Sequence, residues 1–151
     1  MKKLILSGLL LLVFSASGLL AQTNTWGQDY QAALTEAKKT NKPILMNFSG
    51  SDWCKWCKKL DAEVFSQDAF KEYAAKNLVL LLIDSPVQKP MDMATVKQNK
   101  GLITKYQIQG FPTILILSPA GEVIAMTGYQ YGGVEKYVEH LKSLIANTKE
   151  T

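Results

Sequence analysis

"SGSDWCKWCKKL", residues 49–60, holds both cysteines of this 151-residue chain, Cys54 and Cys57. A bridge between them would close a very short loop, for which the chain-entropy model gives only about 2 kcal/mol of stabilisation. A chain of this length buries a sizeable core without a disulfide to hold it. The spacing therefore predicts that the two thiols serve chemistry rather than stability.

The residues around the pair predict a strand followed by a helix. The apolar run "PILMNFSG" (43–50) is typical of a buried strand, and residues 53–65 are predicted to form a helix that begins at the cysteines. Unpaired N–H groups and the helix dipole stabilise a thiolate at a helix N-terminus. We therefore expect a pKa for Cys54 below the free value of about 8.5, and Lys55 adds positive charge beside it.

The spacing of three residues places both cysteines on one face of that helix. Cys54, at the tip, is predicted to be exposed and to act as the nucleophile. Cys57, one turn further in, is predicted to be shielded and to resolve the mixed disulfide that Cys54 forms. Lys58 and Lys59 are further positive charges close to the pair.

The remaining pattern predicts an α/β fold in one domain, residues 22–151. The almost continuous apolar run 78–85 is typical of a central parallel strand, and Ser118–Gly121 is a turn between two hairpin strands. Ser66 is expected to cap a helix, and Gly101 is the weak point of another. The order of elements predicts a central mixed β-sheet with helices on both faces. The other expected elements are strands at 110–118 and 122–129 and helices at 29–40, 66–77, 94–107 and 133–148.

The segment "KPILMNFSGSDWCKWCKKLDAEVF" (42–65) resembles the active-site segment of thioredoxin-fold proteins, with Trp53 directly before the first cysteine. It is most similar to exported thioredoxin-like proteins and to the C-terminal domain of the bacterial thiol:disulfide interchange protein. "GFPTILIL" (110–117) is similar to the cis-proline segment of that family. The resemblance covers roughly residues 26–148. It implies a thioredoxin-like fold and thiol–disulfide exchange with proteins, with no bound organic cofactor.

The resemblance also implies roles for residues outside the cysteine pair. Pro112 is expected to be cis, and the backbone of Phe111 is expected to pair with a substrate chain beside Cys54. Trp53 is expected to shape the substrate site. Gly128 matches the glycine that the family has on its last strand, near the active site.

Four positions depart from the family pattern, and one of them is Leu80, which stands where thioredoxins have a lysine on the neighbouring strand. Asn47 stands where thioredoxins have a buried aspartate, and an amide cannot accept and pass on a proton. The usual proton relay to the second cysteine is therefore expected to be absent. Lys55 is expected to favour the Cys54 thiolate and so to make the pair more oxidising. Trp56 either presents an aromatic face to a partner or packs on the domain.

The N-terminus "MKKLILSGLLLLVFSASGLLAQ" (1–22) has two lysines, a leucine-rich run and small residues that end at Ala21. This pattern predicts a cleaved secretory signal at residues 1–21, hence a periplasmic or otherwise exported protein without stable membrane insertion. An uncleaved anchor is the alternative. Export agrees with the cysteine pair, because disulfides persist outside the cytosol.

Composition limits the partners. All 17 basic residues are lysines, and loss of the signal would leave 15 of them against 13 acidic residues, a net charge of +2. So weak a charge, without arginine, does not predict nucleic-acid binding. We expect a monomer whose partners are protein thiols and disulfides, including a redox partner protein.

Two other classes of function remain open from the sequence. The cysteine pair, or the thioethers of Met91 and Met93, could hold a soft metal such as copper. Structural zinc needs four ligands, and the chain has no second Cys/His pair, so no metal site is predicted. His140 is expected to be a surface or hydrogen-bonded histidine. The other alternative is a non-catalytic protein-binding domain.

Overall fold

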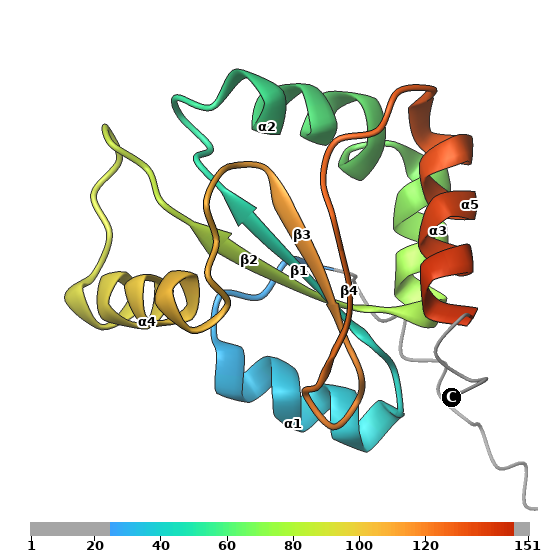
Figure 1. Cartoon of the computed structure of the whole chain (residues 1–151), viewed down its shortest axis with the longest axis horizontal. Coiled ribbons are helices and arrows are strands. Elements are labelled where there is room, and N and C mark those ends of the chain that lie inside the picture. Colours follow the sequence, from blue (N-terminus) through green and yellow to red (C-terminus); the bar gives the residue numbers. More distant parts are fainter. Residues whose placement is uncertain (1–24, 147–151) are drawn as a thin grey trace, which may run out of the picture.

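One four-stranded mixed sheet forms the centre of the computed structural model, which describes residues 25–146 (Figure 1). The strand order is β2-β1-β3-β4; β1 is parallel to β2 and antiparallel to β3, and β3 is antiparallel to β4. The mixed sheet predicted from the sequence is confirmed. The strands are β1 (Ile44–Ser49), β2 (Val79–Asp84), β3 (Thr113–Leu117) and β4 (Val123–Thr127).

Helices cover both faces of this sheet, as predicted (Figure 1). One face packs against α2, a π-helical segment η1, α3 and α5, and the other packs against α1 and α4. The apolar stripe predicted for the last helix is confirmed, since its buried residues are Tyr137, Val138 and Leu141. The bounds are α1 (Tyr30–Thr40), α2 (Lys55–Leu60), η1 (Asp61–Phe65), α3 (Asp68–Asn77), α4 (Met93–Lys105) and α5 (Gly133–Ala146).

The central position predicted for the second strand is wrong, because β2 lies at the end of the strand order. Its outer side is covered in part by Gly27, whose N–H donates to the Leu80 carbonyl (3.0 Å) and whose carbonyl accepts from the Leu82 N–H (2.8 Å). The apolar run has another cause: helices cover both faces of β2, so neither face can be polar.

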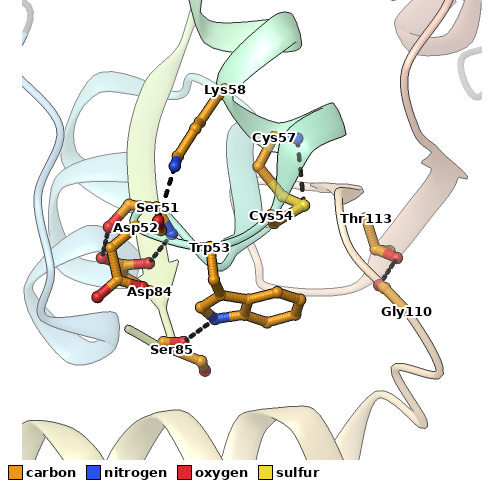
Figure 2. The surroundings of a disulfide bond; sticks show 10 residues. All are labelled: Ser51, Asp52, Trp53, Cys54, Cys57, Lys58, Asp84, Ser85, Gly110 and Thr113. Atoms are coloured by element: carbon orange, nitrogen blue, oxygen red, sulfur yellow. Dashed lines mark hydrogen bonds between the residues drawn. A yellow bond between two sulfur atoms is a disulfide. The ribbon is translucent and has the colours of Figure 1, made fainter. Parts of the chain in front are cut away.

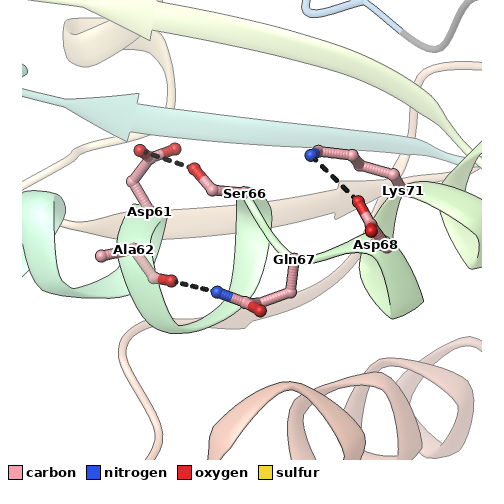
Figure 3. A network of polar contacts seen from close by, with 6 residues as sticks. All are labelled: Asp61, Ala62, Ser66, Gln67, Asp68 and Lys71. Atoms are coloured by element: carbon pink, nitrogen blue, oxygen red, sulfur yellow. Dashed lines mark hydrogen bonds and ion pairs between the residues drawn. The ribbon is translucent and has the colours of Figure 1, made fainter.

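The helix predicted at 53–65 is two segments. The α-helical part ends at Leu60, and Asp61–Phe65 continue as a π-helical turn. Ser66 does not cap the next helix, which begins at Asp68 after Gln67. Figure 3 shows the reason, because the Ser66 hydroxyl donates instead to the Asp61 carboxylate (3.0 Å).

Other expectations concern single positions or termini. Gly101 is exposed and α4 passes through it without a break, so the predicted weak point has no effect on the helix.

The predicted signal at residues 1–21 lies outside the described residues. Between residues 25 and 146, no helix combines the length and apolar character needed to cross a membrane.

Phe70 should be a major contributor to stability. Its ring is fully buried and packs against Phe65, with ring centroids 4.9 Å apart. Phe70→Ala should lower the free energy of unfolding by about 3–5 kcal/mol, the usual cost of removing a buried aromatic ring. Urea denaturation measures this loss. The matched control is Val123→Ala at a residue 52% exposed, where we expect a change within about 0.5 kcal/mol. Equal effects of the two substitutions would contradict the assigned core.

Candidate active site

The active-site helix begins on a sulfur atom. Cys54 has an extended backbone and is the N-cap of α2, and its Sγ accepts the N–H of Cys57 over 3.2 Å. Cys54 and Cys57 form a disulfide, with Cα atoms 5.3 Å apart (Figure 2). The predicted place of the pair at the start of a helix that follows a buried strand is confirmed.

The predicted difference in exposure is not found in this disulfide form. Cys54 and Cys57 are each 6% exposed, so the first cysteine is no more accessible than the second. The bridge holds the two sulfurs together at the helix start, where their surroundings are shared. The separate roles of the two thiols remain a prediction.

Two of the three nearby lysines have other interaction partners. The ammonium group of Lys58 donates to the main-chain carbonyl of Asp52 (2.7 Å). Lys59 lies 5.3 Å from the ring centroid of Trp56 and 3.7 Å from the carboxylate of Glu63. Of the charges that the sequence places near the pair, Lys55 remains, and it is exposed on the first turn of α2.

Trp56 belongs to an aromatic cluster beside the disulfide. Its ring lies 5.2 Å from that of Tyr129 and 6.3 Å from that of Tyr131, between centroids. The Tyr129 hydroxyl donates to Glu63 (2.5 Å), and Lys59 lies over all three rings. Trp56 remains 44% exposed. Packing on the domain, one of the two alternatives stated for Trp56, is therefore found, and presentation of an aromatic face to a partner stays a prediction.

The residues that the family resemblance singled out contact one another in pairs. The Phe111–Pro112 peptide bond is cis, as expected. The rings of Trp53 and Phe111 lie 5.9 Å apart, and the Trp53 indole donates to the Ser85 carbonyl (2.9 Å; Figure 2). Gly128 follows β4, and a Cβ there would lie 3.2 Å from the Pro112 carbonyl, so a glycine suits this close approach.

Asp52 ties a distant loop to this site. Its carboxylate accepts the N–H groups of Val87, Gln88 and Lys89 over 2.6–3.2 Å. Partial desolvation pushes the pKa of Asp52 upward, but the backbone hydrogen bonds outweigh it and hold the pKa below the ordinary value of 3.8. The loop after β2 is thus held against the segment that carries Trp53.

A cavity of about 260 Å³ with a mixed polar and apolar wall, to which Trp26 and Leu82 contribute, lies beside Cys57. Asn47 contributes to its wall from β1; the residue is 7% exposed, and its Oδ1 has no hydrogen-bond partner within the described part of the chain. Asn47 therefore occupies the buried position beside the second cysteine that the sequence assigned to it. The polar residues of the wall are Asn47, Ser49, Ser51, Cys57, Lys58 and Asp61.

A soft-metal site at the cysteine pair, or at Met91 and Met93, is one alternative that the sequence leaves open. Among residues 25–146, no group of three or more His, Cys, Asp and Glu side chains is placed to hold a metal ion. His140 shares a hydrogen bond with the Thr127 hydroxyl (2.9 Å), as expected for a histidine with a structural partner.

Comparison with known proteins identifies the family. The family model for the thioredoxin-like domain matches residues 30–143. The chain belongs to the thioredoxin-like family. Cys54 and Cys57 form a disulfide, and the activity of the chain is thiol–disulfide oxidoreduction.

Two bacterial redox proteins are similar to this chain in sequence. The chain is 31% identical over 126 residues to the disulfide bond reductase DsbH of Chlamydia pneumoniae, which covers 83% of this chain and 76% of the relative. It is 30% identical over 122 residues to the thiol:disulfide interchange protein DsbD of Yersinia pestis, covering 79% of this chain but only 18% of that larger protein. The match to DsbD therefore concerns one part of it.

Solved structures support the same fold. A structure of a DsbH oxidoreductase has a TM-score of 0.78 at 30% identity and covers 93% of this chain and 95% of its own. The reduced C-terminal domain of Neisseria meningitidis DsbD has a TM-score of 0.56 at 21% identity, with 75% of this thioredoxin-like chain and 91% of the domain covered. The second likeness concerns the fold alone.

Sequence reasoning missed Asp52, Tyr129, Tyr131 and Asp61 as parts of the site. The contacts of Asp52 reach a loop 35 or more residues away, and no local pattern indicates them. Asp61 is different, because it follows Cys57 by four residues and so shares a helix face with it. That spacing is visible in the sequence and could have identified Asp61.

The Asp52 contacts predict a pH-dependent loop. Because the pKa of Asp52 is lowered in the folded protein, its stabilisation is complete above the ordinary value of 3.8 and is lost as the pH falls through the lower folded value. The backbone amide resonances of Val87, Gln88 and Lys89 should therefore titrate together in NMR spectra, with a midpoint below 3.8. Asp52→Asn should abolish this titration. Midpoints at or above 3.8 would contradict the assigned hydrogen bonds.

Proposed function

We propose that this chain is an exported disulfide reductase that transfers electrons from a redox partner protein to disulfides of other proteins. The observation that carries the proposal is the match to a protein named disulfide bond reductase, along 76% of that relative's length. Protein thiols are the partners of such chemistry, and the sulfurs of Cys54 and Cys57 hold the transferred electrons.

The charges around the pair support a reducing rather than an oxidising poise. The oxidising expectation depended on the charge of Lys55, which stabilises the Cys54 thiolate, and the two other nearby lysines add little to it. Lys58 instead binds the Asp52 carbonyl, and Lys59 is paired with Glu63 and the aromatic cluster of Trp56, Tyr129 and Tyr131. Lys55 remains, but solvent and salt screen an exposed charge.

In the proposed reaction, the two cysteines act one after the other. The Cys54 thiolate attacks one sulfur of a substrate disulfide and forms a mixed disulfide, while the other substrate sulfur leaves as a thiolate. Cys57 attacks Cys54, the intramolecular disulfide re-forms, and the second substrate thiol is released. The two cysteines lose two electrons and the substrate gains them.

The exposed rings next to the two cysteines suit this substrate class. Trp53, directly before Cys54 in the sequence, is 48% exposed, and Trp56, directly before Cys57, is 44% exposed, while the disulfide itself is nearly buried. Aromatic rings give contact area that does not depend on one particular sequence. A protein segment that docks over both rings would bring its own disulfide to Cys54.

The reduction potential tests the direction of transfer. Equilibration with glutathione buffers should give a value closer to about −270 mV, as in thioredoxin, than to about −120 mV, as in strongly oxidising members of the fold. Cys57→Ser should trap mixed disulfides with protein substrates, whereas Cys54→Ser, the matched control, should not. A potential above about −180 mV, the value of protein disulfide isomerase, would contradict the proposed reductase.

Export has a separate test. The mature protein, purified from cells that express the full chain, should begin at Gln22, and residues 1–25 should carry alkaline phosphatase out of the cytosol in an active form. Mass spectrometry of the intact protein measures the first, and phosphatase activity in whole cells the second. A chain that keeps residues 1–21 and remains in the cytosol would contradict export, and one that keeps them in the membrane would replace the cleaved signal with an anchor.

A further inference from the structure

We propose that Asp61 takes up the proton that Cys57 loses when it resolves a mixed disulfide, through water in the cavity beside Cys57. This inference rests on the thiol–disulfide exchange of the pair, but not on the direction of transfer or on export. It assigns to this chain a proton-relay residue in place of the acid that position 47 lacks.

The cavity gives the proton a path. Its volume of about 260 Å³ is several times the roughly 30 Å³ that one water occupies in the liquid. Cys57, Asn47 and Asp61 all contribute to its wall. The Asn47 Oδ1 is a buried acceptor without a protein partner, and such a group binds water where a cavity is polar and large enough. The amide can orient water between the thiol and a base, although it cannot take the proton itself.

The π-helical turn places Asp61 at this cavity. Asp61 lies one turn after Cys57, and its N–H donates to the Cys57 carbonyl, so both residues share one helix face. In the π-turn, Ser66 reaches back five residues: its N–H donates to the Asp61 carbonyl (2.8 Å) and its hydroxyl to the Asp61 carboxylate (3.0 Å; Figure 3). These bonds hold one carboxylate oxygen, Oδ2, and leave Oδ1 for water.

The other charged groups near the cavity have hydrogen-bond partners of their own. The Lys58 ammonium donates to the Asp52 carbonyl. Asp84 accepts both the N–H and the hydroxyl of Ser51 (2.9 and 2.6 Å), and it does not contribute to the cavity wall. Asp61 is therefore the one carboxylate that contributes to the cavity wall among residues 25–146.

Titratable groups on the helices packed against η1 do not replace Asp61 at the cavity. On α3, Asp68 is paired with Lys71 at 3.3 Å (Figure 3). On α5, burial raises the pKa of Tyr137, which therefore stays neutral, and its hydroxyl donates to the Gly128 carbonyl (3.1 Å). Glu63, in the π-turn itself, accepts from the Tyr129 hydroxyl and pairs with Lys59.

In the proposed step, the Cys57 S–H bond breaks, and the proton passes through cavity water to the Asp61 carboxylate. The Cys57 sulfur attacks the Cys54 sulfur, the bond from Cys54 to the substrate sulfur breaks, and the substrate leaves as a thiolate. Asp61 then releases the proton to solvent, which its exposed position permits. In the reverse reaction Asp61 returns a proton to Cys57.

Reaction of the reduced protein with Ellman's reagent separates the two thiols in time. Attack by Cys54 releases a first thionitrobenzoate, and resolution by Cys57 releases a second, both followed by absorbance in a stopped-flow instrument. General bases contribute about 10²–10⁴-fold, and for an exposed one acting through water we expect Asp61→Asn to slow the second release by about tenfold at pH 6–7. The first release should be unchanged. Above about pH 9 the thiol ionises unaided, and the two proteins should converge.

Two further variants complete the experiment. Asp68→Asn removes an exposed carboxylate outside the cavity wall and should leave both releases unchanged. Asn47→Asp, added to Asp61→Asn, places a carboxylate back in the cavity and should restore the second release at pH 6–7.

Three outcomes would overturn the relay: a second release in Asp61→Asn equal to wild type, one slowed by the same factor at every pH, or no recovery on addition of Asn47→Asp. Absence of both releases in the wild type would overturn the exchange chemistry itself and the relay with it. An oxidising potential of the pair would contradict only the proposed reductase.

Discussion

The Cys54 sulfur accepts the Cys57 N–H over 3.2 Å and so occupies the place of an N-cap oxygen. A thiolate accepts such a bond better than a disulfide sulfur, because hydrogen bonds to ionised groups are about twice as strong as those between neutral groups. The helix dipole acts in the same direction. The start of α2 thus stabilises the Cys54 thiolate as the attacking group, and the remaining structure keeps the sulfur at that position.

The sheet fixes the loop that carries this sulfur. β1 is buried at every residue and lies between β2 and β3, so its C-terminal end cannot move independently. Gly50 follows it and accepts the Cys54 N–H (2.8 Å), and a Cβ at Gly50 would overlap the Trp53 indole. Ser51 is bonded to Asp84 at the end of β2. The ends of two adjacent parallel strands therefore determine where the helix begins.

Patterns within one element were predictable, whereas contacts between distant elements were not. The apolar stripe of α5 and the helix at the cysteine pair follow from spacing alone. The edge position of β2 does not, because helices on both faces give any strand the same apolar composition. Ser66 was misassigned because a serine before a helix resembles a cap, while its actual partner depends on a π-turn that spacing does not reveal. The contacts of Asp52 with the loop at 87–89 depend on the folded chain.

The division between Asn47 and Asp61 has a physical reason. A carboxylate at position 47 would lie in a site 7% exposed, where the charged form loses hydration. An amide there is neutral at every pH and still offers an acceptor to water in the cavity. Asp61, on the same cavity but exposed to solvent, keeps its hydration and can exchange protons with bulk water. The chain thereby separates the buried group that orients water from the group that ionises, and it avoids the cost of a buried charge beside the disulfide.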